Sequence, residues 1–262
     1  MEKELGEIKA NLKKYGQEHI LNHFEELDET HQKELLKEIK GIDFELVTSL
    51  YNNTKKEKKN TKDEITPMNY LDKFKLGDKY KYYENIGKKA IQEGKLAAVT
   101  MAGGQGTRLG HNGPKGTYDI GLDSHKSLFE LLSDGIKEEA KKYGVTIPWF
   151  IMTSRENNKT TVEFFEKHKY FGYQKDKNIF FFIQGELPMM DTEGKILIGE
   201  DGLIKEAADG HGGIYESLVK TGMTKKMKEL GVKWVFIGGV DNCLVKMVDP
   251  VLMGVAIDQQ VT

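Results

Sequence analysis

"LAAVTMAGGQGTRLGHNGPKG", residues 96–116, runs from an apolar segment directly into a loop that contains six glycines. Glycine loses more conformational freedom on folding than any other residue, so such a loop needs either unusual backbone dihedrals or a ligand close to the main chain. Backbone N–H groups in a loop of this kind can point at an anion. The stretch therefore predicts a buried strand followed by a phosphate-binding or nucleotide-binding loop.

Further along the chain, short apolar runs alternate with segments of helical periodicity. Three more runs read as strands: IPWFIMTS (147–154), NIFFFIQG (178–185) and VKWVFIGGVDN (232–242). Strands that alternate with helices predict an α/β fold with a mostly parallel, doubly wound sheet. All four runs lead into polar loops, and ligands in such sheets bind beyond the carboxyl ends of the strands. The pattern thus predicts one site at that edge of the sheet.

The first 64 residues do not follow this alternation. Apolar side chains in residues 1–50 recur at helical spacing, and residues 52–64, NNTKKEKKNTKDE, are polar and rich in lysine. We predict a helical N-terminal region with a linker over residues 1–64 and a core over residues 65–262. The lysine-rich run is interpreted as a solvated linker and not as a nucleic-acid patch.

Composition narrows the class of protein. The 262 residues include 39 basic and 41 acidic side chains, a near balance that argues against nucleic-acid binding. The apolar runs are too short to span a bilayer, and the charged N-terminus lacks the apolar region of a signal peptide. A single cysteine, Cys243, excludes an internal disulfide and a zinc site made of several cysteines. We expect a folded cytoplasmic protein that binds neither nucleic acid nor membrane.

The glycine spacing distinguishes this loop from two common nucleotide-binding motifs. Gly104, Gly106 and Gly110 give G-x-G-x-x-x-G, which is one residue longer than the dinucleotide fingerprint. This spacing disfavours a nicotinamide dehydrogenase, and the G-K-[ST] of a P-loop does not occur. Arg108 and Lys115 lie in the same loop, where a rigid guanidinium and a mobile ammonium suit a polyphosphate.

The segment MAGGQGTRLGHNGPKGTYDIGL (101–122) resembles the signature of the UTP-dependent sugar-1-phosphate uridylyltransferases. It is most similar to the UDP-N-acetylhexosamine pyrophosphorylase branch, and IPWFIMTS with KHKYFG, FFIQGELPMM and GGVDNCLVKMVDP agree in order. The resemblance covers roughly residues 90–258 and implies a Rossmann-like, GT-A-like nucleotidyltransferase core. It also implies that the family fold continues beyond the last residue of this chain.

The resemblance implies roles for individual residues at the strand ends. Nucleotide-binding positions are Met101, Ala102, Gly103, Gly104, Gln184 and Gly210. Gln184 would read the edge of the uracil by hydrogen bonding, and the backbone of the glycine loop would hold the uridine. Arg108 and Lys115 would act as catalytic groups that bind the phosphates and the departing pyrophosphate.

Asp241 is the metal ligand that the resemblance implies. A lone carboxylate at a strand end, facing a polyphosphate, is a natural ligand for Mg²⁺, which proteins bind through one or two carboxylates plus phosphates. An Asx turn that closes the strand is the alternative interpretation of Asp241.

His211 marks a departure within the family. It stands where the acetylhexosamine enzymes most often carry asparagine in the segment that touches the sugar, whereas histidine there is typical of UDP-glucose and broader UDP-sugar pyrophosphorylases. The predicted reaction joins UTP to N-acetylglucosamine 1-phosphate, giving UDP-N-acetylglucosamine and pyrophosphate. The alternatives are a UDP-glucose or broad UDP-sugar pyrophosphorylase that uses glucose 1-phosphate, and a truncated chain that binds UTP without turnover.

Overall fold

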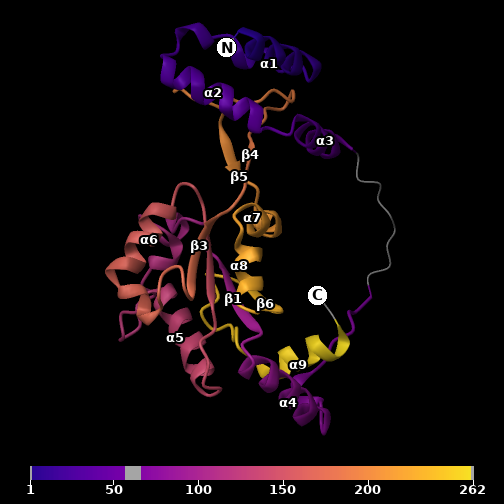
Figure 1. Ribbon diagram of the computed structural model, residues 1–262, viewed down its shortest axis with the longest axis vertical. Coiled ribbons are helices and arrows are strands. Elements are labelled where there is room, and N and C mark those ends of the chain that lie inside the picture. Colours follow the sequence, from indigo (N-terminus) through magenta and orange to yellow (C-terminus); the bar gives the residue numbers. More distant parts are fainter. Residues whose placement is uncertain (1, 57–65, 261–262) are drawn as a thin grey trace. The chain divides into compact units, whose positions relative to one another are not determined.

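The computed structural model describes residues 2–56 and 66–260, with elements labelled in Figure 1. The chain divides into two compact units. One comprises residues 1–66 and 186–209, and the other comprises residues 67–185 and 210–262. No helix within the described ranges is long and apolar enough to cross a membrane.

The second unit is built on a four-stranded parallel sheet with the strand order β3-β2-β1-β6. The strands are β1 (Leu96–Met101), β2 (Trp149–Thr153), β3 (Ile179–Ile183) and β6 (Trp234–Gly239). The predicted α/β class is confirmed. Because all four strands run in the same direction, their carboxyl ends meet at one edge of the sheet.

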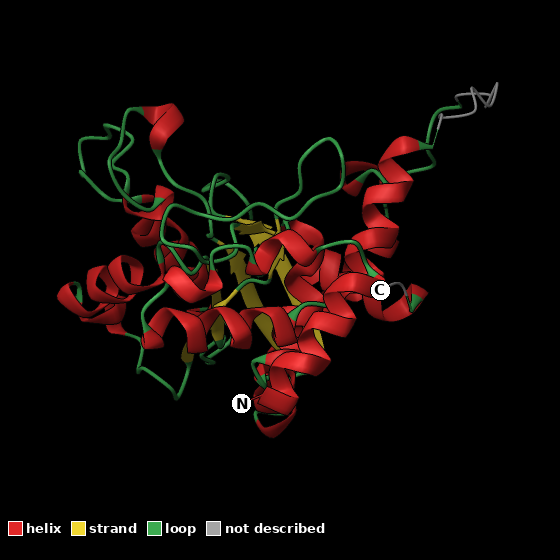
Figure 2. Ribbon diagram, turned by 90° about the horizontal axis from the view of Figure 1, so that it is seen from above, coloured by secondary structure: helices red, strands yellow, loops and turns green. Residues whose placement is uncertain are grey.

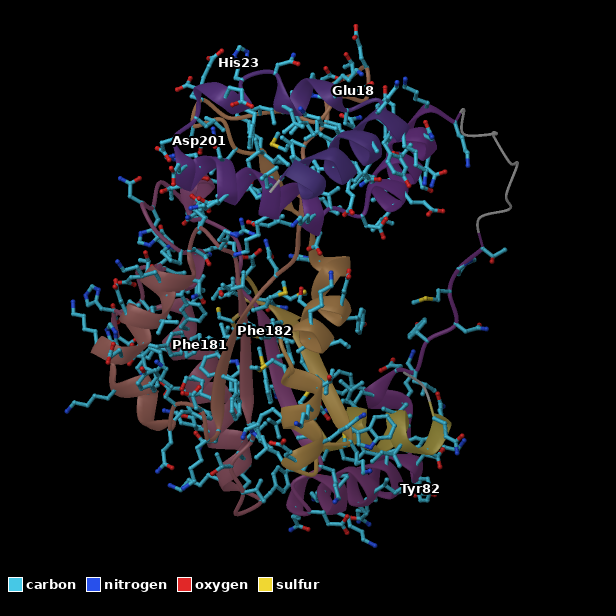
Figure 3. All side chains as sticks on the ribbon, turned by 45° about the horizontal axis from the view of Figure 1, so that its top comes forward. Glu18, His23, Tyr82, Phe181, Phe182 and Asp201 are labelled. Atoms are coloured by element: carbon cyan, nitrogen blue, oxygen red, sulfur yellow. The ribbon has the colours of Figure 1, made fainter. Side chains whose placement is uncertain are left out.

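Helices cover both faces of this sheet, because successive residues of a strand point to opposite sides. Phe182 of β3 packs with Ile214 and other apolar residues of α7 and α8. Its neighbour Phe181 turns the other way and contacts Phe165 of α6, with ring centroids 5.1 Å apart (Figure 3). The four covering helices are α5 (Leu128–Lys141), α6 (Asn158–Lys167), α7 (Ile214–Lys220) and α8 (Met223–Glu229). Figure 2 shows the yellow strands of the sheet between red helices.

Two further helices of this unit cross at very short distance. They are α4 (Lys79–Gln92) and α9 (Pro250–Gln259). A Cβ atom added to Gly87 would lie 1.8 Å from the carbonyl oxygen of Pro250, and one added to Gly254 would lie 1.9 Å from that of Tyr83. Helix α4 matches the helical periodicity of its sequence, whereas α9 was not predicted, because it is apolar on nearly every side and lacks a clear polar face.

The first unit combines three helices with a β-hairpin. The helices are α1 (Glu2–Lys14), α2 (Glu29–Gly41) and α3 (Phe44–Lys55), and the antiparallel strands are β4 (Glu186–Pro188) and β5 (Glu206–Ala208). The predicted helical N-terminal region is confirmed. The predicted linker over residues 52–64 begins later than expected, because residues 52–55 complete α3. Residues 57–64 lie outside the described residues.

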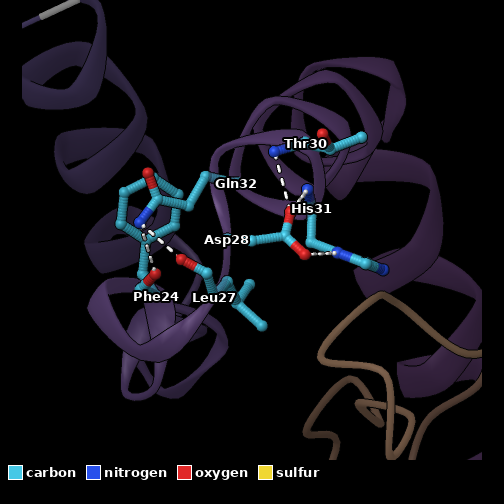
Figure 4. A network of polar contacts seen from close by, with 6 residues as sticks. All are labelled: Phe24, Leu27, Asp28, Thr30, His31 and Gln32. Carbon is cyan, nitrogen blue, oxygen red and sulfur yellow. Dashed lines mark hydrogen bonds and ion pairs between the residues drawn. The ribbon is translucent and has the colours of Figure 1, made fainter.

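A network of polar contacts caps the start of α2 (Figure 4). The carboxylate of Asp28 accepts hydrogen bonds from the N–H groups of Thr30 and His31 and from the His31 ring. These hydrogen bonds, chiefly those from His31, hold the pKa of Asp28 below its ordinary value. The side chain of Gln32 donates to the carbonyl oxygens of Phe24 and Leu27, which fixes the preceding turn.

Short 3-10 turns occur at η1 (Glu18–Leu21), η2 (Phe24–Glu26), η3 (Lys73–Lys75) and η6 (Lys169–Gly172).

Residues 186–209 belong to this helical unit, which differs from the predicted division at residue 64. The buried side chain of Gln17 donates to the carbonyl oxygen of Gly194 at 2.7 Å and accepts from the N–H of Ile196 at 2.9 Å. Ile196 and Ile204 are buried among the apolar residues of the helices. The segment follows β3 without any break in composition, so its long-range pairing has no local signal in the sequence.

Candidate functional site

The glycine-rich loop leaves β1 and folds back on itself as a tight hairpin. The N–H of Lys115 donates to the carbonyl oxygen of Gly104 at 3.0 Å, and the N–H of Gly106 donates to that of Gly113 at 2.9 Å. Gly110 adopts a φ of +69° at the turn, a conformation that side chains other than glycine rarely take. The two arms of the loop are therefore held side by side.

The ring of His111 fills the inside of this hairpin. A Cβ atom on Gly106 would lie 2.8 Å from the Cβ of His111, so a larger residue at 106 would collide with it. The Nε2 atom of His111 lies 2.8 Å from Oγ1 of Thr117, and that hydroxyl donates to the carbonyl oxygen of Pro114 at 2.8 Å. Because the hydroxyl has one hydrogen, the imidazole nitrogen is the donor in the first contact. No pattern in the sequence indicated this role of His111.

Asn157 lies beneath the loop at the start of α6, with 1% of its surface exposed. Its Nδ2 atom donates to the carbonyl oxygens of Ala102 at 3.0 Å and Gly104 at 3.4 Å, and its Oδ1 atom accepts from the N–H of Ser154 at 2.9 Å. The N–H groups of Gly103 and Gly104 donate to no acceptor among the described residues. A loop with occupied carbonyls and free N–H groups suits a ligand that accepts hydrogen bonds.

Gln184 follows β3 and lies against this loop. Its N–H donates to the carbonyl oxygen of Thr153 at 2.8 Å, and only 9% of the residue is exposed. A Cβ atom on Gly103 would lie 2.4 Å from Oε1 of Gln184, so glycine allows the amide to approach the main chain. The residue predicted to read uracil therefore lies beside the backbone predicted to hold uridine.

Lys115 and Asp241 form an ion pair at the same edge. The Nζ atom lies 3.0 Å from Oδ1 and 3.2 Å from Oδ2. The N–H of Val240 donates to the carbonyl oxygen of Met101 at 3.0 Å, so the chain that follows β6 passes the end of β1. This brings Asp241 close to Lys115. The side chain of Asp241 is 65% exposed and that of Lys115 is 18% exposed. A pair this open contributes about 0–1 kcal/mol to stability, so either group can exchange its partner for a ligand.

Three predicted residues stay apart from this cluster. Arg108, in η4 (Thr107–Leu109), is exposed and makes no ion pair or hydrogen bond with a described residue. Gly210 has a φ of +79°, and no heavy atom lies within 4 Å of its Cβ position. His211 begins η7 (His211–Gly213) and is exposed. All three are open to a ligand but are not organised by protein contacts.

Asp241 would have to hold a metal without other protein ligands. In the described part of the chain, no three His, Cys, Asp or Glu side chains gather into a metal-binding group. Mg²⁺ keeps several waters and is commonly bound by one or two carboxylates together with substrate phosphates. The single exposed carboxylate therefore fits a metal that arrives with a polyphosphate, and it does not fit a cation held by protein alone.

A buried polar atom marks one further residue of the loop, Gln105, that has no distinguishing signal in the sequence. Oε1 of Gln105, within the glycine loop, is buried without a hydrogen-bond partner among the described residues. Gln105 follows the second loop glycine and resembled an ordinary polar loop residue. An unpaired buried oxygen costs free energy, so a ligand that donates a hydrogen bond there would stabilise the loop.

Comparisons with known proteins agree with this architecture. Residues 43–262 match the family described as UTP–glucose-1-phosphate uridylyltransferase. UDP-N-acetylglucosamine diphosphorylase 2 of Arabidopsis thaliana is 36% identical over 264 residues, which cover 95% of this chain and 52% of that protein. UDP-N-acetylglucosamine pyrophosphorylase of Saccharomyces cerevisiae is 36% identical over 258 residues, which cover 92% of this chain and 54% of that protein.

A solved structure shows the same fold. The crystal structure of the uridine diphosphate N-acetylglucosamine pyrophosphorylase from Trypanosoma brucei, in complex with inhibitor, superposes with a TM-score of 0.76 and 31% sequence identity. The match covers 96% of this chain and 54% of that one. This chain spans about half the length of the curated relatives it matches.

Proposed function

This chain belongs to the UTP–glucose-1-phosphate uridylyltransferase family, and we propose that it binds UTP and transfers the uridylyl group to N-acetylglucosamine 1-phosphate. The products would be UDP-N-acetylglucosamine and pyrophosphate. The names of the relatives support the acetylated sugar. His211 favours a second candidate, glucose 1-phosphate, because of the family position at which this histidine stands.

The observation that carries the proposal is the meeting of three chemical functions at the end of β1. The loop offers free N–H groups at Gly103 and Gly104. Gln184 brings an amide against Gly103, and Lys115 brings an ammonium group to the same loop. A base with hydrogen-bonding edges, joined to a polyphosphate, uses all three.

The proposed chemistry needs no protein nucleophile. A phosphate oxygen of the sugar 1-phosphate would attack the α-phosphorus of UTP, and the bond from that phosphorus to the oxygen bridging to the β-phosphate would break. Pyrophosphate then leaves with that bridging oxygen. The protein would contribute by positioning the reactants and stabilising charge, through Arg108, Lys115 and the loop N–H groups.

Asp241 would hold Mg²⁺ against the phosphates, and the metal would neutralise part of their charge. We expect Asp241→Asn to abolish the tightening of UTP binding by Mg²⁺ while leaving the fold intact, because the amide is nearly isosteric but uncharged. Calorimetric titrations of UTP with and without Mg²⁺ measure this. Asp119→Asn, which alters another aspartate of the second unit, is the control. An unchanged Mg²⁺ dependence in Asp241→Asn would place the metal elsewhere.

Gln184 and the loop backbone should favour uridine over other bases. A site whose buried polar groups pair with one base leaves them unpaired with another, so discrimination is strong. Calorimetry with UTP and ATP measures it directly. Equal affinity for the two nucleotides would contradict the assignment of Gln184.

The sugar is tested by release of pyrophosphate from UTP with a panel of sugar 1-phosphates. We expect N-acetylglucosamine 1-phosphate to react at least about tenfold faster than glucose 1-phosphate. His211→Asn should widen that difference if residue 211 contacts the sugar. Faster reaction with glucose 1-phosphate would favour the second candidate. A cytoplasmic location is part of the same proposal and is tested by cell fractionation.

A further inference from the structure

We propose that Asn157 is a positioning residue that sets the direction of two peptide planes in the glycine-rich loop. The first is the plane between Ala102 and Gly103, which Asn157 fixes, and the second is the plane between Gly104 and Gln105, which Asn157 fixes together with the N–H of Lys115. The inference rests on the proposed function, because these directions matter for catalysis only if the loop binds a nucleotide. Asn157 is buried and is not expected to touch the ligand itself.

Peptide geometry links the buried amide to the open side of the loop. The C=O and N–H of a trans peptide point in opposite directions, so fixing one fixes the other. Nδ2 of Asn157 holds the carbonyl oxygens of Ala102 and Gly104 at 3.0 and 3.4 Å. The N–H groups of Gly103 and Gln105 consequently point away from the buried amide, where a phosphate or a base can accept from them.

The peptide between Ala102 and Gly103 needs such an external brace. Its carbonyl oxygen accepts from no other group among the described residues, whereas the carbonyl oxygen of Gly104 also accepts from the N–H of Lys115 at 3.0 Å. Glycine populates left-handed and right-handed regions almost equally, so without Asn157 the peptide between Ala102 and Gly103 could turn over at little cost. A turned peptide would present a carbonyl oxygen to the ligand in place of an N–H group. That oxygen would repel a phosphate and leave one hydrogen bond unmade.

Asn157 is itself held rigidly. Its Oδ1 atom accepts from the N–H of Ser154 at 2.9 Å, and its own N–H lies 3.2 Å from Oγ of Ser154. The residue immediately precedes α6, so the brace stands on a helix and not on a second mobile loop. Supports of this kind keep a binding geometry defined before the ligand arrives.

This position needs a side chain that both accepts and donates hydrogen bonds, and an amide does both. It supplies an acceptor for Ser154 and two donor hydrogens for the loop carbonyls. A carboxylate of the same shape would keep the acceptor but would place negative charge against two carbonyl oxygens. Asn157→Asp therefore changes the brace while changing its volume very little.

The test compares the wild type with Asn157→Asp and Thr153→Val. The hydroxyl of Thr153 lies 2.7 Å from Oδ1 of Asn158 and 3.1 Å from the carbonyl oxygen of Phe182, so Thr153→Val removes hydrogen bonding at the same helix start without removing a contact to the loop. We expect Asn157→Asp to weaken UTP binding roughly 10- to 100-fold at about pH 8. Affinity should recover relative to the wild type as the pH is lowered to about 5. Burial and the two facing carbonyl oxygens should raise the pKa of the introduced carboxyl group, and its protonation restores a donor. Thr153→Val should bind UTP within about twofold of the wild type.

Crystal structures of the same variants test the positioning role of Asn157 without relying on UTP binding. A turned peptide between residues 102 and 103 in Asn157→Asp supports the positioning role even if the wild type binds no UTP, a result that would end the proposed function alone. Unturned peptides with wild-type affinity in the folded variant would overturn the inference. An equal loss of affinity in Thr153→Val would also overturn it, since the effect would then come from the helix start. If Asn157→Asp does not fold, Asn157→Ala is the second variant, with the same loss expected but no recovery at low pH.

Discussion

The second unit uses glycine in two places for different reasons: where α4 crosses α9, and in the loop after β1. At the crossing, a Cβ atom on Gly87 or Gly254 would overlap the main chain of the other helix. In the loop, the atoms nearest to a Cβ atom on Gly103 would be those at the end of the Gln184 side chain, 2.4 Å away. A main chain cannot yield to an added methyl group, whereas the end of a side chain can turn aside. Substitution of a glycine at the crossing should therefore lower the free energy of unfolding, and substitution of a loop glycine should change ligand binding.

The largest expected effect is that of Gly254→Ala on stability. The added methyl group would lie 1.9 Å from the carbonyl oxygen of Tyr83, and no rotamer change relieves that overlap. We expect a loss of about 3–5 kcal/mol in the free energy of unfolding, measured by urea denaturation.

Gly135→Ala is the matched control for the crossing. Gly135 lies inside α5, and no heavy atom lies within 4 Å of its Cβ position. Alanine there should raise the free energy of unfolding by about 0.5–1 kcal/mol. A Gly254→Ala variant as stable as the wild type would show that the helices can separate at no cost.

The next-largest effect is on turnover, and it leaves the free energy of unfolding nearly unchanged. Lys115→Ala should slow turnover by about 10² to 10³, the scale for losing one charged group that stabilises a transition state. Its ion pair with Asp241 is open to solvent, so the free energy of unfolding should change by less than about 1 kcal/mol. Arg108→Ala should behave in the same way.

Lys126→Ala is the control for that prediction. Lys126 pairs with Asp134 at 2.6 Å, and neither residue belongs to the loop. Turnover should stay at the wild-type rate in Lys126→Ala. Loss of turnover in both lysine variants, or in neither, would contradict the role assigned to Lys115.

A smaller effect separates two glycines of the same loop. Gly103→Ala would displace the amide of Gln184, so discrimination between UTP and ATP should fall about tenfold while the free energy of unfolding stays within about 1 kcal/mol of the wild type. Gly104→Ala would meet only Lys115, at 3.9 Å, and should leave the choice of base unchanged. Titrations with both nucleotides test the pair. A loss of stability in Gly103→Ala comparable to that of Gly254→Ala would remove the distinction between loop and crossing.

Much of the fold was predictable because local patterns encode it. Apolar runs separated by segments of helical periodicity predicted the four parallel strands. The meeting of Gln184, Lys115 and Asp241 followed from a rule about strand ends. Their binding roles stay predictions, since no ligand contact has yet tested them.

The remaining features depend on contacts between distant parts of the chain. Asn157, in the polar run ENNK, resembles any residue at a helix start, and only its contact with Ala102 reveals its function. In the sequence, Gly87 and Gly254 look only like residues that lower helix stability. The need for glycine is visible only in the structure, where α4 and α9 are in contact. Local propensity cannot carry such information, because each partner is separated from the other by many residues.

The smallest effect arises at the crossing and depends on pH. Asp249 caps α9 by accepting from the N–H groups of Val251 and Leu252, and it pairs with Lys73 at 2.5 Å. Burial raises the pKa of Asp249, but the hydrogen bonds from Lys73 and Leu252 outweigh burial and leave the pKa below its ordinary value of 3.8. A carboxyl group with a lowered pKa in the folded state adds stability above its unfolded pKa of about 4, and this stability is lost as the pH falls through the folded value.

Asp249→Asn should therefore cost about 1 kcal/mol at about pH 7, and the difference from the wild type should shrink below about pH 4. Urea denaturation at several pH values measures it, and a difference that stays constant at low pH would contradict the role of the charge. UTP affinity at about pH 7 should be the same in both proteins, because the contacts of Asp249 are with Lys73 and the first turn of α9 and not with the loop. Reduced affinity in Asp249→Asn would mean that the crossing and the loop are coupled, and the two groups of glycines could then no longer be treated as separate.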